Sequence, residues 1–180
     1  MSKRVLCLLV DGFEEIETFT PVDLLRRAGA EVIMASLTGE RLVTGRSHVT
    51  VQADAELSDV IHGIFDLLLI PGGPGVAALR ADIRPAKLAA DFAKAGKTVA
   101  AICAGPTVLA DAGLLMGKRF TAHFSVYDEL PLALTGERVV EDGGIITSRG
   151  AGTALDFGFA LVRRLFGEAK AKEVTESIMA

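Results

Sequence analysis

The sequence predicts an α/β protein in which a mostly parallel sheet lies between layers of helices. Its apolar runs are nearly continuous, as in strands that are covered on both faces, and amphipathic helical stretches separate them. Strands alternating with helices are typical of a parallel sheet. The chain has 180 residues, 50% of them hydrophobic, so it is long enough to bury a full core. We expect a single domain over residues 1–180.

The elements can be placed in order along the chain. Predicted strands cover residues 4–10, 31–37, 66–70 and 99–102. Predicted helices cover residues 16–29, 85–96 and 153–166, and glycines at 29, 96 and 167 mark where they end. Residues 41–53, around Thr44-Gly45-Arg46, and residues 138–147, around Asp142-Gly143-Gly144, are typical of hairpins. We expect both hairpins at the edges of the sheet.

Composition excludes several classes of function. The net charge is −4 and no block of Lys or Arg stands out, so we expect no nucleic-acid partner. The absence of a signal-like start and of a long apolar stretch favours a cytoplasmic protein with no membrane association. Two cysteines and three histidines form neither a disulfide framework nor a cluster with metal-ligand spacing. We therefore expect no metal.

Cys103 is the leading candidate for a nucleophile. It ends the apolar run at residues 99–102 and stands where a strand turns sharply into a helix. The free N–H groups at the start of a helix favour a thiolate over a thiol. The alternative is an ordinary buried cysteine, which is how we interpret Cys7 within the first strand.

Two more segments follow strands and could lie beside Cys103, because functional groups gather where parallel strands end. Gly72 and Gly73 follow the third predicted strand, and the Gly73 and Ala104 N–H groups could form an oxyanion hole. The alternative for the glycines is a simple tight turn.

Glu17 follows the first strand, on the first turn of a predicted helix. Pro21 cannot donate the bond that the Glu17 carbonyl would accept, so we expect a distorted helix there. The alternative for Glu17 is a solvated, dipole-favoured helix start.

A Glu17 carboxylate about 4 Å from a Cys103 thiolate would repel it by roughly 4 kcal/mol. The pair can then hold only one charge easily, and we expect a thiolate that accepts a hydrogen bond from protonated Glu17.

His123 and Arg46 are weaker candidates. His123 follows another short predicted strand and could act as an acid, a base or a hydrogen-bond donor, or be an ordinary surface histidine. Arg46, at a hairpin tip, could capture an anion near the mouth of the cleft. We expect no functional role for His48 and His62.

Several segments, in order, resemble the ThiJ/PfpI superfamily, in the branch of the Parkinson disease protein deglycase. They are Arg4-Val5-Leu6, Glu14-Glu15-Ile16-Glu17-Thr18, residues 21–29, Leu69-Ile70-Pro71-Gly72-Gly73, residues 100–107 and residues 147–153. The resemblance implies a flavodoxin-like three-layer α/β sandwich, usually a homodimer. Helix 15–29 is the expected interface element.

The resemblance also implies roles for individual residues. The reactive cysteine is Cys103, the protonated glutamate Glu17, the oxyanion loop Gly72 and Gly73, and the active-site histidine His123. Arg46 of one subunit and Arg27 of the partner would contact anions. The chain has Ala151 where this branch often has proline, and the comparison with the branch implies an altered cleft wall there.

The resemblance implies a cofactor-independent enzyme acting on glyoxal, methylglyoxal or their early protein adducts and giving 2-hydroxy acids, a glyoxalase or protein deglycase. The alternative is an oxidative-stress sensor or redox-regulated chaperone that uses oxidation of Cys103. Ala104 stands where protease-like members have histidine, and no histidine follows His123, which disfavours peptidase and glutamine amidotransferase chemistry.

Overall fold

The structure, a computed structural model, describes residues 2–180 and is built around a seven-stranded sheet. The strand order is β5-β2-β1-β6-β7-β9-β8, and every neighbouring pair is parallel except β8 with β9. The strands of this sheet are β1 (Arg4–Leu9), β2 (Glu31–Ser36), β5 (Ala55–Glu56), β6 (Leu67–Ile70), β7 (Thr98–Ile102), β8 (Val139–Asp142) and β9 (Ile145–Ser148).

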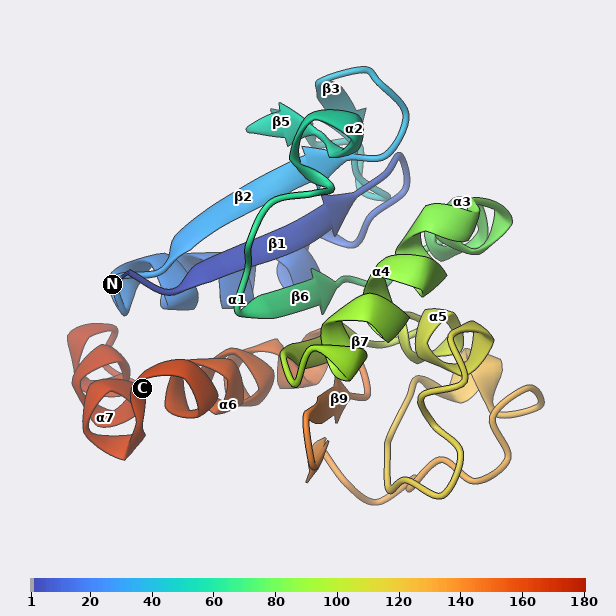
Figure 1. Ribbon diagram of the computed structural model, residues 1–180. Helices are drawn as coiled ribbons and strands as arrows, with labels where there is room; N and C mark the ends of the chain where they lie inside the picture. The colour runs from blue at the N-terminus through green and yellow to red at the C-terminus, as the bar shows by residue number, and fades with distance from the viewer. Residues whose placement is uncertain (1) are drawn as a thin grey trace.

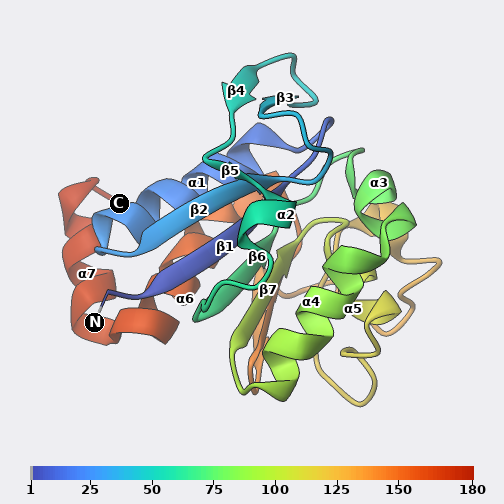
Figure 2. The ribbon, with the colours of Figure 1, turned by 45° about the horizontal axis from the view of Figure 1, so that its top comes forward.

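Helices cover both faces of the sheet (Figure 1). They are α1 (Glu15–Arg27), α2 (Leu57–Val60), α3 (Val76–Ala81), α4 (Ile83–Lys94), α5 (Pro106–Asp111), α6 (Ala154–Phe166) and α7 (Glu168–Ser177). Short 3-10 helices, η1 (Phe124–Val126) and η2 (Ala151–Thr153), lie in the connections. Figure 2 shows α1, α6 and α7 on one side of the strands and α3, α4 and α5 on the other.

Two hydrophobic cores follow from this layering. Alternate residues of each strand point to opposite faces, so Cys7 and Leu9 of β1 pack with α1 and α6, whereas Leu6 and Leu8 pack with α4. All these side chains are at most 1% exposed. The continuous apolar runs therefore reflect strands buried on both faces, as the sequence predicts, and the three-layer α/β fold is confirmed.

The bounds of most predicted strands and helices lie within two residues of the observed bounds. The hairpin over residues 41–53, however, lies elsewhere in the fold than predicted. Its strands, β3 (Leu42–Thr44) and β4 (Thr50–Gln52), pair with each other in a separate two-stranded sheet, so its expected place at the edge of the main sheet is wrong. Its tip docks instead on the loop after β1, where the Gly12 N–H donates to the Thr44 carbonyl at 2.8 Å and the Arg46 N–H to the Phe13 carbonyl at 2.8 Å. The second hairpin does supply the edge strand, β8.

The segments that carry the candidate residues converge where β1, β6 and β7 end. The loop after β6 bonds to the loop after β1: the Glu14 N–H donates to the Gly72 carbonyl at 3.1 Å, and the Gly75 N–H to the Gly12 carbonyl at 3.0 Å. Parallel strands bring these ends to one edge of the sheet. Within residues 2–180, no helix is both long and apolar enough to cross a bilayer.

Candidate active site

Cys103 occupies a strained turn directly after β7. Its φ is +65°, a left-handed conformation that costs a non-glycine residue roughly 1–3 kcal/mol. Two backbone bonds hold it there: its N–H donates to the Ser148 carbonyl at 2.9 Å, and its carbonyl accepts the His123 N–H at 2.9 Å. Strain of this kind concentrates at functional sites and projects the side chain out of the strand.

Glu17 lies on the first turn of α1 and is only 2% exposed. The carboxylate of Glu14 caps this helix by accepting the Glu17 N–H at 2.7 Å. Despite Pro21, α1 runs without a break from Glu15 to Arg27. Glu17 Oε2 is buried, so a solvated helix start is excluded for this side chain.

Because Gly72 and Gly73 have no side chains, Glu17, Cys103 and the neighbouring backbone can lie close together. A Cβ atom on Gly72 would overlap both Glu17 Oε2 and the Cβ atom of Cys103. Gly73 has a φ of +99°, and a Cβ atom there would lie 2.7 Å from the Glu14 nitrogen. Neither position has room for a side chain, so the glycines form more than a simple tight turn.

The backbone N–H groups of Gly73 and Ala104 both interact with the Cys103 sulfur and lower its pKa. They are the two groups expected to form an oxyanion hole, and they lie beside the sulfur to which the carbon bearing the oxyanion would be bonded.

The pKa values of the two buried groups are both raised. Burial is the largest cause for Glu17 and raises its pKa to about 7; the hydrogen bond from Cys103 lowers it, and the charge of Glu14 raises it. The N–H groups of Gly72 and Ala151 also lower it. Burial and then the Glu17 carboxylate raise the pKa of Cys103 to about 12.

A second charge on the pair is disfavoured, because burial raises the pKa of both groups and the Glu17 carboxylate raises the pKa of the thiol beside it. The resting thiolate with a protonated Glu17 stays a prediction. Burial outweighs the two N–H groups at the sulfur. In addition, α5 opens with Pro106, which has no N–H, and the Thr107 and Val108 N–H groups are already bonded to the carbonyls of Ala104 and Gly105. The start of α5 leaves few free donors for a thiolate.

His123 and Arg46 line the same cavity as Cys103. The residues before His123 form no strand, contrary to expectation; instead His123 caps η1, and its Nδ1 lies 2.9 Å from Ser125 Oγ. Burial and then the charge of Arg46 lower the pKa of His123, so it is neutral near pH 7. The Arg46 side chain has no ion pair or hydrogen bond within the described part of the chain, which leaves its guanidinium free at the cavity.

The remaining candidates lie elsewhere. Arg27 is exposed near the end of α1 and pairs with Asp23 at 2.7 Å; it does not line the cavity of its own chain. His48 and His62 are exposed, at the hairpin tip and after α2. Cys7 is fully buried in β1, and burial raises its pKa far above the ordinary value, so it belongs to the core as expected.

The cavity above Cys103 has a volume of about 460 Å³. The sequence did not single out several of its lining residues, namely Pro74, Val76, Ala77, Arg80, Thr107, Ser125 and Val126. They lie on α3, α5 and η1 or next to these elements, and each resembles an ordinary helix or loop residue in the sequence, so no local signal marks them.

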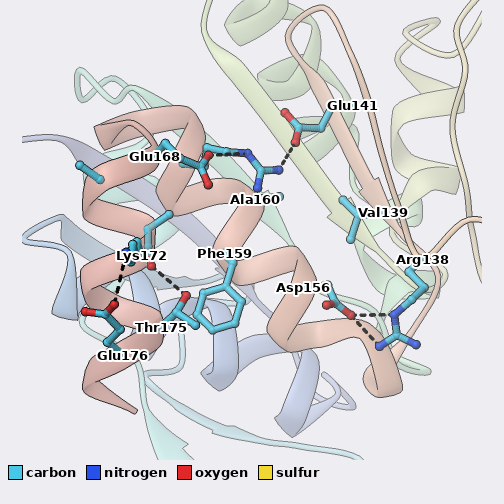
Figure 3. Close-up of a pocket in the computed structure, with 13 residues that line it drawn as sticks. Arg138, Val139, Glu141, Asp156, Phe159, Ala160, Glu168, Lys172, Thr175 and Glu176 are labelled. Carbon is cyan, nitrogen blue, oxygen red and sulfur yellow. Dashed lines mark hydrogen bonds and ion pairs between the residues drawn. The ribbon is translucent and has the colours of Figure 1, made fainter. Parts of the chain in front are cut away.

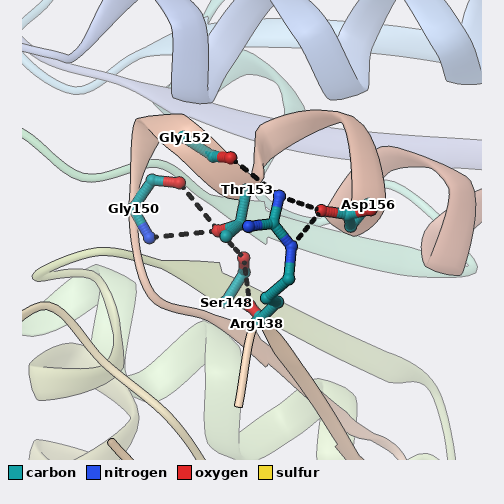
Figure 4. Close-up of polar contacts among 6 residues, drawn as sticks. All are labelled: Arg138, Ser148, Gly150, Gly152, Thr153 and Asp156. Carbon is teal, nitrogen blue, oxygen red and sulfur yellow. Dashed lines mark hydrogen bonds and ion pairs between the residues drawn. The ribbon is translucent and has the colours of Figure 1, made fainter. Parts of the chain in front are cut away.

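A buried hydroxyl cluster supports the wall that contains Ala151 (Figure 4). Thr153 Oγ1 lies 2.6 Å from Ser148 Oγ and 2.8 Å from the Gly150 carbonyl, and it accepts the Gly150 N–H at 3.3 Å. Arg138 reaches over this turn to the Gly152 carbonyl at 3.0 Å and to Asp156 at 2.6 Å. The cluster fixes the turn that contains Ala151, whose N–H group lowers the pKa of Glu17.

A second cavity, of about 760 Å³, lies between β8, α6 and α7, away from Cys103 (Figure 3). Its arginines and lysine form ion pairs: Arg138 with Asp156, Arg163 with Glu141, and Lys172 with Glu176. No cysteine or histidine lines it. The candidate nucleophile, Cys103, and the neighbouring Glu17 therefore line the smaller cavity.

Comparison with known proteins decides the family. The DJ-1/PfpI family matches residues 3–164. The chain belongs to the DJ-1/PfpI family. It is 36% identical over 186 residues to Protein dj-1beta of Drosophila melanogaster, covering 99% of this chain and 98% of that protein. It is 36% identical over 179 residues to the Parkinson disease protein 7 homolog of Danio rerio, covering 96% of this chain and 95% of the relative.

Solved structures of DJ-1 proteins share the fold. The crystal structure of Drosophila melanogaster DJ-1beta superposes with a TM-score of 0.96 at 36% identity, covering 100% of this chain and 99% of that one. The structure of oxidised Toxoplasma gondii DJ-1 gives a TM-score of 0.93 at 34% identity, covering 99% and 98%. The family resemblance seen in the sequence is confirmed over nearly the whole chain.

We expect Gly72→Ala to lower the free energy of unfolding of this DJ-1/PfpI protein by about 1–3 kcal/mol, because the new methyl group overlaps Glu17 and Cys103. Urea denaturation measures the change. Gly136→Ala is the matched control, since a Cβ atom there meets nothing within 4 Å. Equal stability of the two variants would contradict the close approach at Gly72.

Glu17→Gln should remove a pH-dependent loss of stability. The Glu17 pKa is raised from 4.5 to about 7 on folding, so its neutral form stabilises the native state below pH 4.5, and this contribution is lost as the pH rises through about 7. A rise of this size corresponds to about 3 kcal/mol. Between pH 4 and pH 8 the variant should therefore gain about 3 kcal/mol relative to wild type in denaturation experiments. A difference between the variant and wild type that does not change with pH would contradict the raised pKa of Glu17.

Proposed function

We propose that this protein is a cofactor-independent glyoxalase or deglycase that converts glyoxal, methylglyoxal or their early protein adducts into 2-hydroxy acids. The observation that carries the proposal is the buried contact between Glu17 and the Cys103 thiol beneath an open cavity, with the Gly73 and Ala104 N–H groups at the sulfur. A glutamate with a pKa of about 7 can both accept and return a proton near neutral pH.

In the first step, the sulfur of Cys103 attacks the aldehyde carbon of methylglyoxal. The S–C bond forms as the thiol proton moves to the Glu17 carboxylate, so no free thiolate is needed beforehand. The Gly73 and Ala104 N–H groups stabilise the developing oxyanion, which becomes the hydroxyl of a hemithioacetal when Glu17 returns a proton.

In the second step, the Glu17 carboxylate removes the proton from the former aldehyde carbon, giving an enediolate. Reprotonation at the neighbouring carbon leaves a 2-hydroxy thioester on Cys103. The adjacent carbonyl is reduced as the aldehyde carbon is oxidised, so no external oxidant is required. Water then cleaves the S–C bond, which releases lactate and restores the thiol.

Two more residues can act on these intermediates. The free guanidinium of Arg46 faces the cavity and would attract the enediolate and the carboxylate product. His123 is neutral near pH 7 and can donate a hydrogen bond to a substrate oxygen. Both cysteines are free, and because the mechanism needs a reduced thiol, we place the protein in the cytoplasm.

The second candidate function is an oxidative-stress sensor or redox-regulated chaperone that uses Cys103. One solved relative, the DJ-1 protein of Toxoplasma gondii, is described as oxidised. In this chain, a Cys103 sulfinate could accept hydrogen bonds from the Gly73 and Ala104 N–H groups and from protonated Glu17.

A steady-state assay of lactate formation from methylglyoxal tests the first function, in buffer without amines or thiols, for wild type and Cys103→Ala. We expect turnover by wild type only, and its loss after mild peroxide treatment. If wild type forms no lactate from methylglyoxal or glycolate from glyoxal, while peroxide oxidises Cys103 selectively, the sensor function is favoured instead.

We also propose that the protein forms a homodimer through α1, with Arg27 of the partner near the site. Ile16, on the first turn of α1, is 53% exposed, and Leu155, on the adjacent helix α6, is 47% exposed, so apolar side chains lie uncovered there. Sedimentation equilibrium at micromolar concentration should give a dimer for wild type and a weaker one for Ile16→Asp. The exposed Ile83→Asp change serves as control. A wild-type monomer would contradict the proposal.

A further inference from the structure

Arg80 joins three separate elements through one guanidinium group. On α3, its Nε and Nη2 atoms donate to the two carboxylate oxygens of Asp111, on α5, at 2.7 and 3.0 Å. Its Nη1 atom donates to Glu129 Oε2 at 2.7 Å. These three contacts use both edges of the guanidinium, and the pairs with Asp111 and Glu129 both raise its pKa, so it stays charged.

Each of the three joined elements carries one part of the candidate active site. The Gly72-Gly73 loop leads into α3, and the Cys103-Ala104 turn leads into α5. Glu129 lies in the turn after η1, the short helix that His123 caps. Arg80 itself lines the same cavity as Cys103 and His123.

The geometry of this contact differs from that of an ordinary surface ion pair. A partly exposed pair contributes little to stability, but a planar guanidinium that binds a carboxylate through two donors fixes both distance and direction. α3 and α5 have only six residues each, and α3 buries only Val76 and Leu79, so this helix is not held by a long packed face. A rigid contact near their ends restrains how far the loops at their beginnings can move apart.

We propose that Arg80 is a positioning residue. It fixes the separation between the Gly73 N–H, in the loop before α3, and the Ala104 N–H, in the turn before α5, so that both can donate to the oxyanion of a substrate bonded to Cys103. The inference rests on the proposed function for its role in turnover. Its effect on the Cys103 thiol does not depend on that function, because the same two N–H groups interact with the sulfur in the free protein.

The test compares Arg80→Met with Arg84→Met. Arg84 also forms a close pair, with Asp82 at 2.6 Å, and donates to the Leu37 carbonyl at 2.8 Å, but it does not line the cavity. We expect Arg80→Met to lower kcat for methylglyoxal about tenfold with KM within about twofold, since misplaced donors affect the transition state more than substrate binding. Arg84→Met should keep the wild-type kcat.

A second readout is the rate at which iodoacetamide alkylates Cys103 at fixed pH. A displaced N–H group raises the pKa of the thiol, and one unit corresponds to about tenfold less thiolate, so alkylation of Arg80→Met should slow by up to about tenfold. Arg80→Lys keeps the charge without the two-donor contact and should fall between Met and wild type. Asp111→Asn with Glu129→Gln should reproduce the defect while Arg80 is intact.

The outcomes separate the two proposals. The inference is overturned if Arg80→Met and Arg84→Met have the same rate of Cys103 alkylation, the same kcat and the same loss of thermal stability. Arg80 would then have only a structural role. A rise in KM alone would make Arg80 a substrate contact and would also overturn it. If wild type has no turnover but alkylation slows only in the Arg80 variants, the proposed function fails and the positioning role stands.

Discussion

Cys103→Ser is expected to lower kcat for methylglyoxal by about 10³-fold or more while the protein stays folded. A hydroxyl of similar size can occupy the strained turn and keep the bonds that its backbone makes with Ser148 and His123. It cannot form the reactive sulfur adduct, however, and removing a nucleophile usually eliminates most of the catalysis. Lactate formation and a thermal melt measure the two properties.

Cys7→Ser is the matched control for this change. Cys7 is fully buried on β1, away from the cavity, so its variant should lose some stability but retain kcat. Wild-type turnover by Cys103→Ser would contradict covalent catalysis. Loss of turnover in both variants would show that folding, rather than the thiol, limits activity.

Glu17→Gln is expected to lower kcat by about 10²- to 10⁴-fold. The amide retains the shape of the carboxyl group but can neither accept the proton of Cys103 nor transfer a proton from the former aldehyde carbon to the neighbouring carbon. The acid limb of the pH profile should change as well: in wild type, kcat/KM rises with pH through about 7 as the pair gains its single charge, and in the variant this step disappears.

Glu14→Gln is the companion variant for Glu17→Gln. Its amide oxygen can still cap α1 by accepting the Glu17 N–H, but the charge that raises the Glu17 pKa is gone. The midpoint of its pH profile should therefore fall below that of wild type while turnover persists. An unchanged pH profile in both variants would rule out Glu17 as the titrating group.

The sequence predicted the layers, the parallel strands and the convergence of Glu17, Gly73 and Cys103 because these follow from local patterns. Continuous apolar runs mark strands buried on both faces, and glycines or acidic residues after a strand lie where parallel strands end. The place of the hairpin around Gly45 depended instead on its docking to the loop after β1, which no periodicity records.

The surroundings of the Cys103 thiol were harder to predict for the same reason. The sequence marks Cys103 as lying at a helix start, but only the structure shows how deeply it is buried and that Thr107 and Val108 have already used their N–H groups. No local sequence pattern marks Arg80, because its two carboxylate partners, Asp111 and Glu129, lie far away along the chain. Long-range partners of this kind are visible only once the fold is known.

The most direct test is to trap the bond between substrate and sulfur. Glu17→Gln should still add methylglyoxal slowly but fail to isomerise it, so intact-protein mass spectrometry should show one added methylglyoxal, and peptide mapping should place it on Cys103 with Cys7 unmodified. Cys103→Ser combined with Glu17→Gln should show no such adduct. A Glu17→Gln protein that turns methylglyoxal over at the wild-type rate and carries no adduct on Cys103 would contradict the paired thiol and carboxylate mechanism.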